Sequence, residues 1–433
     1  MSSSSGRLAR FSLRKTPATR LRVLRGLIRH ATRNVPFYAD LYREAGVKQE
    51  DFVSLEDLAW LPVAERERLL GEQHLRVRAD RERLVKRSTS GSTGAPMTVW
   101  ATPSEAFFRK ATLLLSFGRA ARLRFPLTIA DVGTYTKGHD LVQALRLVRV
   151  QRIYRSLPIV EQVRNLSRIA PDLIEGRPSS LLDVAREACK LRVSLPRPRV
   201  VISFGEMLHR SDREWLEKAF RCRVADYYNC EEIGNVAWEC PEHPGRMHVN
   251  GDTTLLEIVD DDGRPLPPGE SGRVLLTNLT NWTMPFIRYA IQDQATNLGE
   301  GRCGCGFTGT SMRLLEGRDD DFFLLPDGRR VSPRTVDTAI TGVLPASEPG
   351  NDLFRAIQRF QIVQEAPDLV AVYVVPGPQY SDDLWSGVES SAKSLHPSMR
   401  VRIECVDELR TSAGGKFRKV MSLVSAEERG AAR

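Results

Sequence analysis

The spacing of apolar residues changes near Val200, and this change limits the fold more than any other feature of the chain. Before it, residues 21–47 place apolar side chains three and four positions apart and break at Pro36, and residues 105–122 show similar spacing, so both segments predict helices. After it, short apolar runs separated by glycine, proline and aspartate predict strands, residues 284–290 among them. Helices and strands in this order predict an α/β fold.

The 433 residues are enough for two or three domains at roughly 150 residues each. A cluster of glycine, aspartate and proline over residues 317–333 is the expected boundary between two of them. Three short apolar runs beyond it predict a compact α+β module of about 110 residues. We therefore expect a basic arm over residues 1–20, a large N-terminal domain over 21–318 and a small C-terminal domain over 319–433.

Composition excludes several classes of protein. With 41% hydrophobic and 27% charged residues, the chain has enough apolar material for a core, so we do not expect global disorder. The longest apolar run, residues 369–375, is too short to cross a membrane, and the first residues do not resemble a secretion signal. The net charge of +9 is spread along the chain, which suits a polyphosphate ligand but does not by itself identify one, and we expect no nucleic-acid partner. Seven cysteines, an odd number, favour reduced thiols in a cytoplasmic protein.

Residues 88–96 read STSGSTGAP and combine two glycines with five hydroxyl residues. Glycine allows the backbone N–H groups of such a loop to approach an anion closely, and the hydroxyl groups add further donors. The loop lacks the Gly-Lys-Ser/Thr ending of the common P-loop. On composition alone an ordinary surface loop is the better interpretation, so a functional role depends on the motifs that follow.

Five further motifs follow the loop in a fixed order. They are SFGE at residues 203–206, YNCEEIG at 228–234, PFIRYAIQD at 285–293, GRDDD at 317–321 and GGKFR at 414–418. Together with the loop they resemble the adenylate-forming superfamily of acyl- and aryl-CoA synthetases, nearest to the phenylacetate–CoA ligase branch. The resemblance runs from about Leu21 to Lys419. It implies a large N-terminal adenylate-forming domain of several subdomains and a small, mobile α+β C-terminal domain.

The resemblance implies an ATP-dependent ligase that converts a carboxylic acid to acyl-AMP and then to a thioester of coenzyme A. Elementary chemistry agrees with the residue types of the motifs. A carboxylate is already ionised at neutral pH and needs no general base to attack the α-phosphate. The difficulty is repulsion between anions, so positioning and positive charge carry the catalysis.

The resemblance also implies which residues bind ATP. They are Ser90, Gly91, Ser92, Thr93 and Gly94 in the loop, then Gly205, Glu206, Tyr228, Asn229, Asp293 and Arg318. The loop would hold the phosphates, with Thr93 also acting in catalysis. Tyr228 would stack on adenine, and Asp293 would bind the ribose hydroxyl groups.

Three further roles follow from the same resemblance. Glu232 would hold Mg²⁺, since carboxylate oxygens are ligands that this ion prefers. Lys416 would bridge the α-phosphate and the attacking carboxylate, delivered by the C-terminal domain as it turns about a hinge at Asp320.

The chain departs from the usual pattern at three positions. Ala95 replaces a lysine of the loop, Glu231 replaces a threonine, and Gln292 replaces the glycine before the ribose aspartate.

A set of thiol and imidazole groups predicts a second, structural metal site. Cys303 and Cys305 flank a glycine, and Cys240 and His248 come from another segment, so together they supply a tetrahedral set for Zn²⁺. His248 is preferred over His243 because it begins a predicted strand. Four protein ligands leave no open position for catalysis. The alternative is that these are ordinary reduced cysteines in loops.

Several alternatives stay open at this point. The acyl group could pass to an amine or to a carrier-protein thiol instead of coenzyme A. The basic excess also leaves open a nucleotide-binding or nucleic-acid-binding protein without catalysis. The presence of Lys416 and Asp293 favours an enzyme. Tyr135 and Phe204 are compatible with an aromatic acid, but aromatic side chains also line apolar pockets generally. We expect a monomer or homodimer.

Overall fold

The structure is a computed structural model, and it describes residues 16–47, 52–71, 81–88, 97–121, 126–134, 148–318, 322–344, 356–411 and 417–424. It consists of two compact units, which are described separately. The first comprises Met1–Pro126, His139–Val148 and Ala225–Leu315, and the second comprises Leu127–Gly138, Arg149–Val224 and Glu316–Arg433. The α/β fold class predicted from the sequence is confirmed. The predicted division of the chain near Asp320 stays a prediction.

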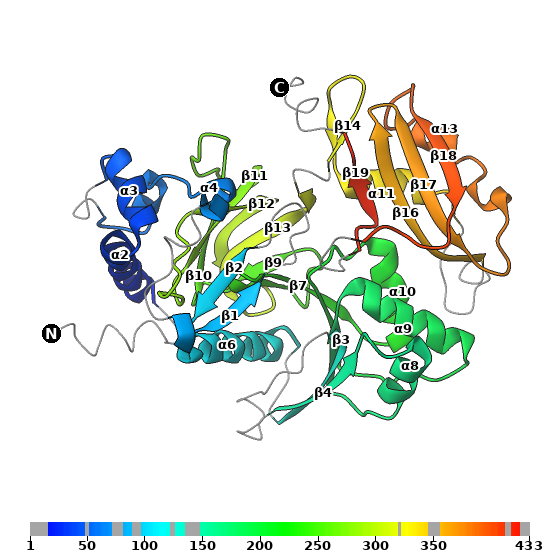
Figure 1. Ribbon diagram of the computed structural model, residues 1–433, viewed down its shortest axis with the longest axis horizontal. Coiled ribbons are helices and arrows are strands. Elements are labelled where there is room, and N and C mark those ends of the chain that lie inside the picture. Colours follow the sequence, from blue (N-terminus) through cyan, green and yellow to red (C-terminus); the bar gives the residue numbers. More distant parts are fainter. Residues whose placement is uncertain are drawn as a thin grey trace. The chain divides into compact units, whose positions relative to one another are not determined.

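The first unit contains one large sheet and a separate hairpin (Figure 1). The sheet order is β10-β11-β12-β13-β9-β8-β7, and β1 pairs with β2. The strands are β1 (Val85–Ser88), β2 (Thr98–Ala101), β7 (Val224–Cys230), β8 (Gly234–Glu239), β9 (Met247–Val249), β10 (Thr254–Val259), β11 (Ser271–Asn278), β12 (Tyr289–Arg302) and β13 (Thr308–Arg318). Helix α6 (Pro103–Ala121) packs beside β2 and β8.

The predicted N-terminal helix is found as two helices, α2 (Pro17–Asn34) and α3 (Pro36–Glu44), with the break at the predicted proline. The hydroxyl group of Thr16 accepts a hydrogen bond from the backbone N–H of Thr19 and caps α2, because the first N–H groups of a helix have no partner within it. The apolar stripe of α2 joins the core of the first unit. A shorter helix, α4 (Arg66–Gly71), follows.

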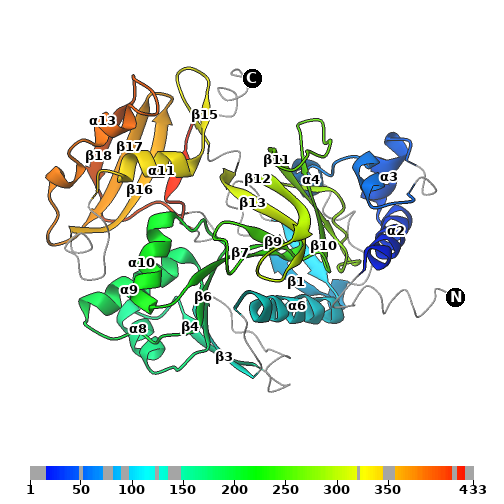
Figure 2. The ribbon, with the colours of Figure 1, turned by 180° about the vertical axis from the view of Figure 1, so that it is seen from behind.

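The second unit contains two sheets. The first has the order β6-β5-β3-β4, and Figures 1 and 2 show helices packed beside it. Its elements are β3 (Leu127–Thr134), β4 (Val148–Tyr154), α8 (Ile159–Ser167), β5 (Leu173–Gly176), α9 (Pro178–Lys190), β6 (Val200–Phe204) and α10 (Arg210–Phe220). Strands β3, β5 and β6 are parallel, which places their carboxyl ends at one edge.

The second sheet of this unit has the order β18-β17-β16-β19. Its elements, with a small hairpin before them, are β14 (Phe323–Leu324), β15 (Arg330–Val331), α11 (Pro333–Thr341), β16 (Ile357–Ala366), β17 (Leu369–Pro376), α13 (Val388–Ala392), β18 (Arg400–Cys405) and β19 (Val420–Ser422). The three strands expected after the predicted boundary are β16, β17 and β18. Strand β19 adds a fourth, parallel to β16.

Residues 284–290 differ from the predicted strand, since β12 begins only at Tyr289. The cause is Arg288, which has a φ of 46° and is buried. Its guanidinium forms an ion pair with Glu257 and donates to the carbonyl groups of Ala59, Leu61 and Gly263. A buried charge needs such partners, and satisfying them turns the backbone out of the extended conformation.

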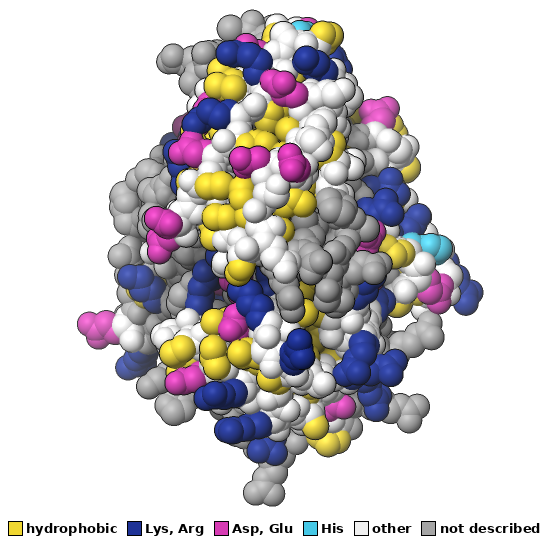
Figure 3. Space-filling view, turned by 90° about the vertical axis from the view of Figure 1, so that its right-hand side faces the viewer, with side chains coloured by type: hydrophobic (Ala, Val, Ile, Leu, Met, Phe, Trp, Pro, Cys, Tyr) yellow, Lys and Arg dark blue, Asp and Glu magenta, His cyan; other side chains and the backbone are white. Residues whose placement is uncertain are grey.

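Among the residues that the structure describes, no helix has the length and apolarity that a membrane span requires. Figure 3 shows Lys and Arg side chains dispersed over one face, among Asp, Glu and apolar side chains. This distribution agrees with the mild, spread positive charge inferred from the sequence.

Candidate functional site

Two residues expected to contact the nucleoside meet in the first unit. Tyr228 lies on β7 and Asp293 on β12, 65 residues further along the chain. The hydroxyl group of Tyr228 donates a hydrogen bond of 2.6 Å to Oδ2 of Asp293. Asn229 follows Tyr228 on β7. The sheet thus places an aromatic ring and a carboxylate together, a pair able to bind a base and its ribose.

Glu232, the expected magnesium ligand, lies in a buried polar cluster. Its Oε1 accepts hydrogen bonds from Arg66, at 2.8 Å, and from the hydroxyl group of Tyr289, at 3.0 Å. The side chain of Glu232 is only 4% exposed, so its charge requires the Arg66 partner. Burial, and then the charge of Glu232, raise the pKa of Tyr289 well above its usual range, which keeps the phenol protonated as a donor.

Glu231, the unusual acid beside Glu232, is paired with two arginines. Its Oε2 lies 3.1 Å from Arg109 on α6 and 3.5 Å from Arg87 on β1. Arg109 also donates to the backbone carbonyl groups of Cys230 and Glu231. The second carboxylate of the motif is therefore neutralised within the unit, and Arg87 ties the strand that precedes the Ser/Gly loop to the 228–232 motif.

The backbone explains why resembling enzymes have glycine where this chain has Gln292. Gln292 has a φ of 67°, in the left-handed region that strains residues with a Cβ atom. Its side-chain amide donates a hydrogen bond of 2.8 Å to Glu67 on α4. The strained residue lies inside β12, directly before Asp293, where the pairing with β11 shifts in register, and it sets the direction in which β12 presents that carboxylate.

We expect the free energy of unfolding of Gln292→Gly to exceed that of Gln292→Ala by about 1 kcal/mol, because only glycine adopts this φ without strain. Urea denaturation of both variants measures the difference. Gln294, two residues on in the same strand, is the matched control, and there alanine should be the more stable. Equal stability of the Gly and Ala variants at position 292 would contradict a left-handed backbone there.

In the second unit, Gly205 and Glu206 follow β6 directly. Gly205 has a φ of 77°, which glycine adopts without strain. The carboxylate of Glu206 accepts hydrogen bonds of 3.2 Å from the backbone N–H groups of Ser179 and Phe417. Phe417 is the residue after Lys416, so the chain next to the expected catalytic lysine contacts an expected nucleotide-binding residue within this unit.

A buried charge cluster lies close to this contact. Lys419, which is 8% exposed, has its Nζ 3.2 Å from Asp337 on α11 and 3.2 Å from the hydroxyl group of Ser211 on α10. His209, at the start of α10, lies 3.4 Å from the other oxygen of Asp337. Burial opposes ionisation of Asp337, but the charges of Lys419 and His209 outweigh it and hold its pKa well below its usual range.

Some expected site residues lie outside the described residues. They are Ser90, Gly91, Ser92, Thr93, Gly94, Asp320 and Lys416, together with the side chain of Arg318, whose backbone ends β13. Conversely, the sequence did not reveal the roles of Arg66, Arg87 and Arg109. No local pattern could have identified them among 63 Lys and Arg residues, because each pairs with an acid more than a hundred residues away.

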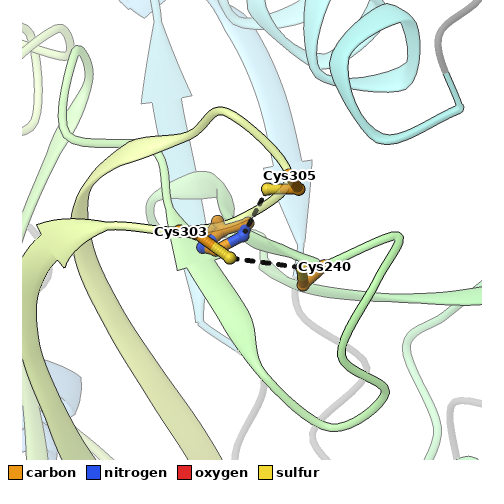
Figure 4. A group of neighbouring side chains, drawn as sticks. Cys240, Cys303 and Cys305 are labelled. Carbon is orange, nitrogen blue, oxygen red and sulfur yellow. Dashed lines mark hydrogen bonds between the residues drawn. The ribbon is translucent and has the colours of Figure 1, made fainter.

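The four predicted metal ligands come together in the first unit (Figure 4). Their ligand atoms all lie within 4.8 Å of one another, with Sγ of Cys240 3.7 Å from Sγ of Cys303 and Sγ of Cys305 3.2 Å from Nε2 of His248. Zinc–sulfur bonds of about 2.3 Å in a tetrahedron give a sulfur–sulfur separation of about 3.8 Å, so the set fits zinc.

The surroundings of His248 orient its ring for this role. Nδ1 lies 3.1 Å from the hydroxyl group of Ser311, and the ring stacks on Phe307 with 4.2 Å between centroids. Burial, followed by the charge of Arg246, lowers the pKa of His248 to about 4, so the imidazole is neutral at neutral pH. A neutral ring with Nδ1 engaged leaves Nε2 free to bind a metal, as histidine ligands in proteins commonly do.

Comparisons with known proteins identify relatives of the chain. No family model matches it. A phenylacetate–coenzyme A ligase from Thermus thermophilus is 30% identical over 331 residues, which cover 74% of this chain and 74% of that protein. The enzymes of the same name from Escherichia coli and Aromatoleum evansii are each 28% identical, over 337 and 339 residues, and 74% of each is covered.

Solved structures agree in fold. A 2-hydroxyisobutyryl-CoA ligase in its postadenylation state, bound to 2-HIB-AMP, gives a TM-score of 0.77 at 20% identity and covers 96% of this chain and 90% of its own. An anthranilate CoA ligase in complex with anthranoyl-AMP gives 0.58 at 20% identity, covering 82% and 68%. The adenylate-forming fold is thus shared, and the sequence relationship with the Thermus thermophilus enzyme is close enough to assign the chain more narrowly. The chain belongs to the phenylacetate–CoA ligase family.

Proposed function

We propose that this ATP-dependent, AMP-forming acid–thiol ligase activates an aromatic or arylacetic acid and transfers it to coenzyme A. The observation that carries the proposal is the meeting of Tyr228 with Asp293 beside the Glu231–Glu232 motif, in a chain whose curated relatives are named phenylacetate–coenzyme A ligases. Phe204, which ends β6, is compatible with an aromatic acid. Tyr135 lies outside the described residues.

In this proposal each residue of the site has a physical task. Tyr228 stacks on adenine, and Asp293 accepts hydrogen bonds from the ribose hydroxyl groups. Glu232 would hold Mg²⁺, which supplies positive charge to the phosphate oxygens. Arg66 and Tyr289 bind Oε1 of Glu232 and so fix the direction of its carboxylate. The loop at residues 88–96 would donate hydrogen bonds to the phosphates.

The C-terminal part of the proposal concerns Lys416 and Asp320. A small C-terminal domain would turn about Asp320 and bring the Lys416 ammonium to the α-phosphate, where it offsets charge in the transition state. The contact between Phe417 and Glu206 supports the proposal, because Phe417 directly follows Lys416 in the chain. A second orientation would then admit the thiol of coenzyme A.

ATP–pyrophosphate exchange with a panel of acids tests the function. The panel should hold phenylacetate, benzoate, 2-hydroxyisobutyrate, aliphatic acids and amino acids. We expect exchange with aromatic or arylacetic acids, and a coenzyme A thioester in the mass spectrum only when coenzyme A is present. Exchange without a thioester would favour an amine or a carrier protein as acceptor. ATP binding without exchange for any acid would make the chain a nucleotide-binding relative without catalysis.

Asp293→Ala is expected to weaken nucleotide binding by about 1.5–3 kcal/mol, because the ribose hydroxyl groups lose a charged acceptor. Calorimetric titration with ATP measures this. Tyr228→Phe keeps the stacking ring and loses only the hydroxyl group, so it should weaken binding less. The matched control is Asp262→Ala, a change to an exposed acid in a turn that pairs with Arg264. Wild-type affinity in Asp293→Ala would exclude the ribose role.

We also propose that Cys240, His248, Cys303 and Cys305 hold one structural Zn²⁺. Their fit rests on the distances above and on the orientation of His248 by Ser311. The ligands come from the end of β8, from β9 and from the turn between β12 and β13, so the metal would cross-link three segments of one sheet. None of the seven cysteines is in a disulfide, which fits a protein of the reducing cytoplasm.

A further inference from the structure

The chain departs from the motifs that it resembles at two positions near the expected phosphate site. The lysine of the loop is Ala95, and the threonine of the 228–232 motif is Glu231. The first change removes a positive charge, and the second puts a negative charge in place of a donor. A chain that binds a triphosphate needs a compensating positive group, and the contacts of Glu231 indicate where it lies.

Arg109 is less suited to this need because both of its Nη atoms already donate to the 230–231 segment. Its guanidinium donates to Oε2 of Glu231 and to the backbone carbonyl groups of Cys230 and Glu231. It is largely buried beneath the motif, with 22% of its side chain exposed. Arg109 therefore neutralises Glu231 and fixes the 230–231 backbone.

Arg87 is held much more loosely. Its Nη1 lies 3.5 Å from Oε2 of Glu231, the limit of a hydrogen bond, and the two side chains are 39% and 40% exposed. An ion pair so exposed contributes little, so a stronger anion can take the guanidinium from it. Two arginines around one carboxylate also leave a net charge of +1, which remains for a ligand.

The position of Arg87 in the chain shows that its guanidinium lies on the face of β1 next to the 228–232 motif. Arg87 lies on β1, three residues before Ser90, the first residue of the expected phosphate-binding segment. Side chains alternate along a strand, and the preceding Lys86 is on the other face, 5.9 Å from the centroid of the Trp100 ring. Of these two neighbouring cations, Arg87 therefore faces the 228–232 motif.

We propose that Arg87 binds the β- or γ-phosphate of ATP, and that Glu231 holds its guanidinium beside the nucleotide until ATP arrives. The proposal rests on the proposed function, since it assigns a residue to the same nucleotide site. A guanidinium presents paired N–H donors that match phosphate oxygens, so one arginine can replace both a lysine charge and a threonine donor. The family motifs that this chain resembles assign no role to position 87.

The test compares ligands that differ only in their phosphates. Calorimetric titration of the full chain with ATP, AMP and inorganic tripolyphosphate should show Arg87→Ala binding ATP and tripolyphosphate about tenfold or more weakly, with AMP changed less than twofold. Arg87→Lys keeps the charge and should recover part of the loss. Lys86→Ala, the neighbour on the opposite face, is the control and should bind all three ligands as the wild type does.

Glu231→Gln separates phosphate binding from a structural role. It breaks the same ion pair from the other side but keeps the guanidinium, so ATP affinity should stay at the wild-type value or rise. Equal losses of ATP and AMP affinity in Arg87→Ala, or a loss in Glu231→Gln that matches it, would overturn the proposal. The wild type could show no pyrophosphate exchange while Arg87→Ala still binds tripolyphosphate more weakly than the wild type. That result would refute the proposed function and support this inference.

Discussion

Lys416→Ala is expected to lower the rate of ATP–pyrophosphate exchange by about a hundredfold or more while leaving ATP affinity within a few fold of the wild type. The lysine would reach the α-phosphate only when the C-terminal domain closes, so its contact forms mainly in the transition state. Removal of such a contact lowers the rate of the chemical step and not the binding of substrate. Single-turnover formation of acyl-AMP, measured beside ATP titration, separates these two effects.

The second half-reaction provides the internal control for this experiment. Once acyl-AMP exists the lysine has little left to do, so Lys416→Ala given synthetic acyl-AMP and coenzyme A should still form thioester. Lys393→Ala, a change to an exposed lysine beside α13, should leave both half-reactions intact. Normal exchange in Lys416→Ala would mean that residue 416 is an ordinary turn lysine. Equal losses in both half-reactions would indicate a misfolded C-terminal part instead of a lost catalytic group.

Loss of the zinc site is expected to have the largest effect on stability. A ligand that binds only the folded state stabilises it by RT ln(1 + [L]/Kd), which is about 4 kcal/mol when free zinc is a thousand times its Kd. We therefore expect Cys303→Ser to lose the metal and to unfold at a markedly lower temperature. Elemental analysis of protein purified without added zinc should give one zinc per wild-type chain, and none in the variant.

Two comparisons make the zinc result specific. Cys405→Ser changes an exposed thiol outside the four-ligand group and should keep both zinc and stability. A chelator should lower the unfolding temperature of the wild type toward that of Cys303→Ser and leave that variant unchanged. A zinc content near zero in the wild type, together with an unaltered Cys303→Ser, would mean that these residues are a cluster of ordinary thiols.

The predictions from sequence succeeded where the relevant signal was local or chemically rare. The α/β class followed from apolar spacing. The four residues that the structure brings together could be chosen because the chain has only seven cysteines and seven histidines, and their binding of zinc stays a prediction. The extended form expected for residues 284–290 was wrong, because the buried hydrogen bonds of Arg288 to distant carbonyl groups override the local apolar pattern. Gln292 appeared as a departure from a motif, but only the backbone shows that its position is left-handed.

The contacts around Glu232 could not be predicted from the sequence. Arg66 is 166 residues away from it, in a helix that also contains Glu67 and Arg68. Arg66 meets Glu232 and Tyr289 because the tertiary structure brings α4 against the start of β12, and no spacing rule within α4 encodes that contact. Long-range pairing of common charged residues therefore had to come from the structure.

The cluster of Lys419, Asp337 and His209 affects the rate at which the C-terminal part could change its orientation. These charges lie in a nearly dry environment between α10, α11 and β19. If the C-terminal strands turn away from α10 between the two half-reactions, the ammonium and carboxylate must be hydrated and later dehydrated in each catalytic cycle. Exchange of these ionic contacts for water would then contribute to the free-energy barrier of the conformational change, in addition to bending of the chain at a hinge.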